Sequence, residues 1–155
     1  MAVANTNVAQ AELYGASLSI TTPIIGSLSA NTNVTYTHGY DLTNGLPLDH
    51  IPPVYGNLNL KYTKKTWTAE AFTLFNRWKH TWEYSPTGED NPDKATTDGT
   101  YVWATLNLRG NYCFTSKLNL QLTAENLLDT NYRTFASGIN GTGRNIVATL
   151  SYNWL

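Results

Sequence analysis

The side chains best suited to chemistry are three histidines and a group of acidic residues. His38, His50 and His80 stand alone in the sequence. The acidic residues Glu89, Asp90, Asp93 and Asp98 gather between positions 81 and 99. The same stretch carries the aromatic residues Trp82 and Tyr84. Loop carboxylates can bind calcium and a histidine can ligate haem iron, but neither group has the fixed spacing of a metal motif. We therefore predict a solvated loop with no metal site.

Covalent catalysis has no support in the sequence either. The single Cys113 has no partner for a disulfide or a metal site. Nucleophile, base and orienting residue do not occur as a set, so the sequence predicts neither an enzyme nor a bound cofactor. A net charge of −1 lacks the basic field that nucleic-acid binding requires.

The elements that must position these side chains are β-strands. Charged residues make up 14% of the chain and aromatic residues 12%, which is far from the charge-rich surface of a soluble helical protein. No apolar run of about 18 residues exists, so a membrane-spanning helix is excluded. Apolar and polar residues alternate with the period of two that is typical of strands. The alternation predicts about seven strands, around 12–22, 28–36, 57–62, 67–78, 102–109, 117–126 and 145–154.

The connections between these strands alternate in length. Residues 23–26, 63–66 and 111–116 form tight links. Residues 41–53, 81–99 and 127–143 are long and rich in Gly, Pro, Asn and Asp. Short turns at one rim and long loops at the other are typical of transmembrane β-barrels.

The chemistry of the two strand faces indicates a membrane. The polar face carries mostly Asn, Thr, Ser and Gln, which suits a wet lumen, and the apolar face ends in rings that prefer the headgroup level. These rings are Tyr36, Tyr62, Trp67, Tyr112, Tyr152 and Trp154. The prediction is therefore an all-β fold in the lipid bilayer of the outer membrane. It is an antiparallel up-and-down transmembrane β-barrel segment with short periplasmic turns and long extracellular loops. A β-sandwich core is the alternative.

Three charged residues are predicted to brace the lumen. Arg109, Glu125 and Arg144 lie on or near the polar face of neighbouring strands. A carboxylate between two guanidinium groups forms strong charge-assisted hydrogen bonds, so we expect a structural polar network in the barrel wall.

Strand parity bears on the extent of the domain. Bacterial single-chain barrels have an even number of strands, which leaves both ends in the periplasm. Seven strands counted back from a periplasmic position 155 place residues 1–10 outside the cell. We therefore expect residues 1–155 to be the C-terminal part of an outer-membrane β-barrel domain, with earlier strands upstream. A further hairpin hidden within 81–100 would instead complete a small barrel of about eight strands.

Four motifs occur in a characteristic order. Residues 7–15 contain Asn-Val followed by Ala-Glu-x-x-Gly, and residues 46–53 lead from a loop into Pro-Pro. Residues 125–132 follow the pattern Glu-Asn-Leu-hydrophobic-Asp-x-x-Tyr, and residues 143–145 are Gly-Arg-Asn. Together they resemble the C-terminal barrel of TonB-dependent outer-membrane receptors, particularly those of Bacteroidota-like bacteria.

This resemblance implies a barrel of about 22 strands around an N-terminal plug. Such a receptor imports a scarce nutrient, such as an iron-siderophore, haem or cobalamin, with energy relayed by the TonB system. The plug and the TonB contact would belong to the region upstream of this stretch. Outer-loop residues would contact the nutrient, and the candidates are His50, His80, Trp82 and Tyr84. Two other functions fit the alternation: a small self-contained outer-membrane barrel acting as adhesin or structural protein, and a soluble β-barrel or sandwich that binds a ligand.

Overall fold

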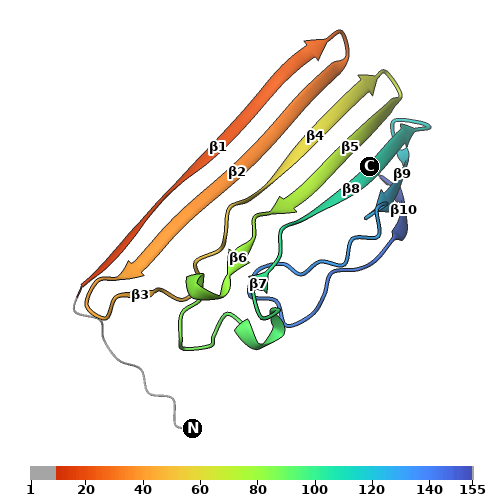
Figure 1. Ribbon diagram of the computed structural model, residues 1–155. Helices are drawn as coiled ribbons and strands as arrows, with labels where there is room; N and C mark the ends of the chain where they lie inside the picture. Colours follow the sequence, from red (N-terminus) through yellow and green to blue (C-terminus); the bar gives the residue numbers. More distant parts are fainter. Residues whose placement is uncertain (1–9, 155) are drawn as a thin grey trace.

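The computed structural model describes residues 10–154 as one antiparallel sheet with loops gathered at one end (Figure 1). Seven long strands form the sheet: β1 (Ala11–Ile25), β2 (Leu28–Asp41), β4 (Tyr55–Lys64), β5 (Trp67–Asn76), β8 (Trp103–Cys113), β9 (Leu118–Glu125) and β10 (Asn145–Tyr152). The seven predicted strands are confirmed. No helix within these residues is long and apolar enough to cross a membrane.

The strands pair in chain order. Each of the seven is antiparallel to its neighbour, in the order β1-β2-β4-β5-β8-β9-β10, and the short strand β3 (Leu46–Pro47) adds to β2. Residues 81–100 hide no further pair of spanning strands. They contain two 3-10 turns, η1 (Thr81–Glu83) and η2 (Pro92–Lys94), and the strand β7 (Gly99–Thr100), which pairs with β6 (Lys79–His80) over only two residues.

Turns and loops are sorted to opposite ends of the sheet. The three tight turns join β1 to β2, β4 to β5, and β8 to β9 at the end of the sheet drawn at the top of Figure 1. The long connections all lie at the other end, which we call the loop end. In the first tight turn Gly26 has a φ of 55°, a conformation that glycine adopts without strain. The predicted sorting of connections by length is confirmed.

Where β8 and β9 pair, the polar face of the sheet is buried and the apolar face is exposed. Along β8 and β9 the polar residues Thr105, Asn107 and Thr123 are 2%, 4% and 4% exposed. Their neighbours Leu106, Leu108 and Leu122, which point to the other side, are 38%, 47% and 50% exposed. A water-soluble barrel or sandwich would bury its leucines instead. This distribution favours a membrane protein over the soluble alternative.

The sheet is open within residues 10–154. Because six antiparallel pairings join the seven strands, the edge strands β1 and β10 run in the same direction. An antiparallel ladder between these two edges is therefore impossible, and closure in that mode requires an odd number of further strands. Unpaired backbone groups at a sheet edge are not tolerated in lipid. The topology argues against a self-contained barrel of these seven strands.

Candidate membrane face, lumen and loop pocket

Aromatic rings end the apolar face at the turns. They form contacting pairs, with centroid distances of 5.3 Å between Tyr62 and Trp67, 4.8 Å between Tyr112 and Phe114, and 5.1 Å between Tyr152 and Trp154. Strand alternation places these rings on the same face as the exposed leucines. Amphipathic rings at this position match the level of lipid headgroups.

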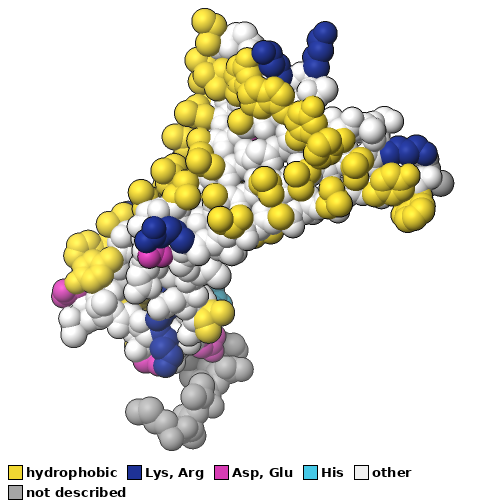
Figure 2. Space-filling model, turned by 90° about the vertical axis from the view of Figure 1, so that its right-hand side faces the viewer, with side chains coloured by type: hydrophobic (Ala, Val, Ile, Leu, Met, Phe, Trp, Pro, Cys, Tyr) yellow, Lys and Arg dark blue, Asp and Glu magenta, His cyan; other side chains and the backbone are white. Residues whose placement is uncertain are grey.

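A second aromatic group ends the same face at the loop end. His38 stacks between Tyr14, at 4.7 Å, and Tyr40, at 6.2 Å. Leu28 pairs with Tyr62 in register, so ten residues of β2 separate the two ring levels. At about 3.4 Å per residue and a tilt of about 35–45°, this gives an apolar band about 24–28 Å high. That height agrees with the band of about 25 Å in transmembrane barrels. Figure 2 shows hydrophobic side chains along the sheet and the acidic ones gathered at the loop end.

Two of the predicted ligand residues lie together in an aromatic stack. The ring centroid of His80 lies 4.6 Å from that of Trp78 and 5.4 Å from that of Trp82. The ring planes of His80 and Trp82 differ by only 7°. Tyr101 continues the stack at 4.6 Å from Trp78. Trp82 ends it and is 71% exposed, so its ring offers a flat surface at the loop end.

The other two predicted ligand residues hold loops together. The side chain of His50 lies between carboxylates, with Nδ1 3.0 Å from Asp90 and Nε2 3.2 Å from Glu89. The His50 backbone N–H also donates to Asp90, whose carboxylate is buried. Tyr84 is buried and its hydroxyl lies 2.8 Å from Thr100 Oγ1. The structure therefore places His50 and Tyr84 apart from the stack formed by His80 and Trp82.

A buried lysine, which sequence reasoning did not single out, joins several loops. Lys79 is 2% exposed, and its ammonium donates to the carbonyl oxygen of Ile51. Its Nζ also lies 4.6 Å from the ring of Phe135 and 5.0 Å from that of Tyr84. Rings stabilise a cation in this way, but burial lowers the pKa of Lys79 because it disfavours the charged form.

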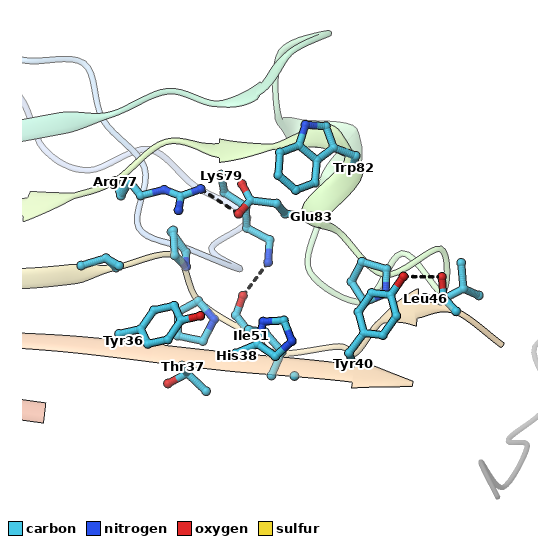
Figure 3. A pocket seen from close by; sticks show the side chains of 16 residues that line it. Tyr36, Thr37, His38, Tyr40, Leu46, Ile51, Arg77, Lys79, Trp82 and Glu83 are labelled. Carbon is cyan, nitrogen blue, oxygen red and sulfur yellow. Dashed lines mark hydrogen bonds and ion pairs between the residues drawn. The ribbon is translucent and has the colours of Figure 1, made fainter. Parts of the chain in front are cut away.

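A pocket of about 470 Å³ opens between β2, the segment that follows β3, and η1 (Figure 3). Its lining includes Tyr36, His38, Ile51, Lys79 and Trp82. The glycine at position 39 makes the arrangement possible, because a Cβ there would collide with the side chain of Ile51.

The predicted lumen network is wrong in its membership. Arg109 does lie on the polar face, but it pairs with Glu70, at 3.3 Å, and not with Glu125. Glu70 is 10% exposed and also binds Lys61 Nζ at 3.1 Å, so one carboxylate bridges two cations. The Arg109 guanidinium also lies 4.8 Å from the ring of Phe72.

Glu125 and Arg144 belong to separate contacts that close the last loop. Glu125 lies opposite Asn145 in register and accepts from its amide at 3.4 Å. Arg144 pairs with Asp129 at 3.2 Å and also donates its backbone N–H to that carboxylate. These contacts hold the pKa of Asp129 below its usual value. The predicted three-residue network is replaced by three separate pairings, because Thr123 and not Glu125 lies opposite Arg109 in the β8–β9 ladder.

Asn126, the second residue of the motif at 125–132, has a structural role in the last loop. Its φ is 49° and its side chain is 2% exposed. The amide donates to the carbonyls of Thr130 and Thr142 at 2.9 and 3.0 Å, and its oxygen accepts from the Thr130 N–H at 2.9 Å. The motif residues thus fasten both ends of the long loop to β9 and β10. In the first motif, residues 7–9 lie outside the described residues.

Comparison with known proteins agrees with this geometry. Residues 2–127 match the family described as TonB dependent receptor-like, beta-barrel. A search of curated protein sequences gives no significant match.

Solved structures with the same fold include the copper transporter OprC, with 18% identity, a TM-score of 0.79, and coverage of 92% of this chain. Two variants of the ferric enterobactin receptor PfeA from Pseudomonas aeruginosa match at 21% identity, with a TM-score of 0.70 and 94% coverage. The chain spans 23% of the length of each of these proteins.

The family match covers most of the sequence, and the structural matches cover nearly all of it. TonB-dependent receptors are outer-membrane transporters and not enzymes. The all-β antiparallel sheet, the open apolar face and the sorted connections are those of such a barrel wall. The chain belongs to the TonB-dependent receptor-like β-barrel family.

Proposed function

We propose that the chain forms part of the wall of an outer-membrane receptor that takes up a small-molecule nutrient with energy from the TonB system. The observation that carries this proposal is that β8 buries a polar residue and exposes apolar ones, the reverse of a soluble protein. Asn107 is buried, whereas its neighbours Leu106 and Leu108 are exposed. In lipid the leucine face gains contact with acyl chains, while the polar face lines a water-filled lumen.

The proposal includes a direction across the membrane. Short turns face the periplasm in barrels of this kind, so the loop end would lie outside the cell. Residues 1–155 would then form the C-terminal part of the barrel domain, and the TonB contact would be made by the N-terminal region of the complete receptor.

Direction can be tested by cysteine labelling in a Cys113→Ser background. Thr87→Cys, in an exposed loop, should react with a membrane-impermeant maleimide on intact cells. Lys117→Cys, in the β8–β9 turn, should react only after the outer membrane is opened. Labelling of position 117 but not position 87 on intact cells would reverse the proposed direction.

The nutrient would first meet the exposed ring of Trp82 and the stack behind it. His50 and Tyr84 would act indirectly, by holding the loops in place. The nutrient classes that we propose are iron-siderophore, haem and cobalamin. The similar folds belong to a copper transporter and a ferric enterobactin receptor, so copper and ferric enterobactin are tested beside haem and cobalamin.

Uptake gives the functional test. Cells that depend on this receptor are given ferric enterobactin with radioactive iron, copper(II), haem or cobalamin, with and without a working TonB system. We expect one probe to accumulate only when TonB works, and Trp82→Ala to reduce its accumulation. The matched control Trp67→Ala changes a ring at the turn end and should leave accumulation near the original level. Accumulation that is independent of TonB for every probe would contradict active transport.

A further inference from the structure

Three rings that line the loop pocket stand on the lipid-facing side of β2. Figure 3 shows Tyr36, His38 and Tyr40 pointing from β2 into the pocket, while Thr37 points to the other side. By strand alternation the three rings share a face with Val34 and, across the β1–β2 ladder, with Leu18. These three rings are therefore turned away from the lumen.

The pocket also lies at the level of lipid headgroups. His38 and Tyr40 belong to the aromatic group that ends the apolar band at the loop end. Directly below on the same face are Leu18 and Ile20, 57% and 46% exposed. A molecule seated in the pocket could continue along these side chains with an apolar tail.

The lining of the pocket carries more cations than carboxylates. Arg77 Nη2 pairs with Glu83 Oε1 at 2.8 Å, and Glu83 Oε2 also accepts the His80 N–H at 2.7 Å. Lys79 has no carboxylate within ion-pair distance in the described part of the chain. Among the lining residues one carboxylate faces two cations, while Asp90 and Asp49, outside the lining, also act on Lys79. The buried ammonium has one hydrogen-bond acceptor although it carries three donors.

We propose that this pocket binds the phosphate of a lipid headgroup in the membrane leaflet around the loop end. The ammonium of Lys79 and the guanidinium of Arg77 hold the phosphate, and the ring of Tyr36 flanks the headgroup. The acyl chains run down the apolar face over Leu18 and Ile20. Basic pockets at headgroup level bind anionic lipids by the same combination of charge and apolar contact.

The test is a titration of the receptor in detergent micelles, followed by native mass spectrometry. Dioleoyl phosphatidic acid supplies the phosphate and both chains, dioleoylglycerol supplies the chains alone, and inorganic phosphate supplies the anion alone. We expect tight binding of only the first. Equal binding of dioleoylglycerol would overturn the phosphate contact, and equally tight binding of inorganic phosphate would show a site for free anions and overturn the lipid assignment.

Charge variants locate the site. Lys79→Met should weaken phosphatidic acid binding about tenfold or more, because a charge-assisted hydrogen bond is lost. Lys117→Met, at the opposite end of the sheet, is the matched control and should bind as the original does. Equal binding by the two variants would overturn the proposal.

A second pair of variants covers the case in which Lys79→Met does not fold. Glu83→Gln keeps an acceptor for the His80 N–H but removes the competing negative charge, so it should tighten phosphatidic acid binding several-fold. Arg77→Gln should weaken that binding, because it leaves the carboxylate without its cation. Changes in the same direction, or no change in either variant, would contradict a phosphate site between these residues.

Discussion

An arginine at the centre of the apolar face should destabilise the protein in a bilayer. Leu108 is the middle residue of β8 and is 47% exposed on that face. A charged residue at the bilayer mid-plane of a barrel costs about 2–4 kcal/mol, which falls to about 0–1 kcal/mol near an interface. We therefore expect Leu108→Arg to lower the free energy of unfolding by about 2–4 kcal/mol.

The assay is guanidinium titration of the receptor in phosphatidylcholine vesicles, followed by tryptophan fluorescence. Val102→Arg is the matched control, since Val102 is 64% exposed beside the first residue of β8, near the loop end. It should lose no more than about 1 kcal/mol. If the face were in water, both exposed positions would accept arginine within about 0.5 kcal/mol. Equal, small losses in the two variants would refute the membrane assignment of this face.

Three further predictions concern the lumen and the last loop. Glu70→Gln leaves Lys61 and Arg109 side by side without their shared carboxylate, and we expect a loss of about 1 kcal/mol in the unfolding titration, moderated because both cations are partly exposed. Asp129 has a lowered pKa in the folded state, so its stabilising contribution is present above the unfolded pKa of about 3.9 and is lost as pH falls through the folded value. Asp129→Asn should remove this part of the acid dependence, measured by unfolding from about pH 5 down to about pH 2. Asn126→Ala should destabilise by about 2 kcal/mol or more through lost hydrogen bonds and a strained positive φ, whereas Asn126→Gly relieves the strain and should lose less; equal losses would assign the whole effect to the hydrogen bonds.

Much of the sheet could be predicted because the relevant physics is local. The alternation of apolar and polar residues with a period of two predicts which residues face lipid, and Gly and Pro indicate where strands end. One lumen ion pair was also within reach of the sequence. Lys61 and Glu70 are equally distant from the tight turn after β4, so a two-residue hairpin pairs them directly.

The remaining lumen contacts could not be predicted because they depend on pairing across long loops. Arg109 reaches Glu70 only because β8 returns beside β5 after the loop at 81–99, and the sequence does not fix that register. The alternation therefore placed Arg109 on the correct face but with the wrong partner.

The loop pocket was hidden for a different reason. Lysine is a residue type that usually lies on the surface. Lys79 is buried by Ile51, Tyr84 and Phe135, which come from three separate segments. The sequence has no periodic signal for such a meeting of loops. His50 and Tyr84 were singled out as ligand contacts because their types suit binding, but their neighbours in the fold already satisfy their polar groups.

The most direct test of the account is which face of the sheet meets lipid. Spin labels at single cysteines in positions 104 to 108, in a Cys113→Ser background, report access to oxygen, which concentrates in the bilayer. With the receptor in phospholipid vesicles, electron paramagnetic resonance should show high oxygen access at positions 104, 106 and 108 and low access at 105 and 107. High access at 105 and 107 instead, or uniform access along the strand, would contradict the assignment of the apolar face to lipid and of the polar face to the lumen.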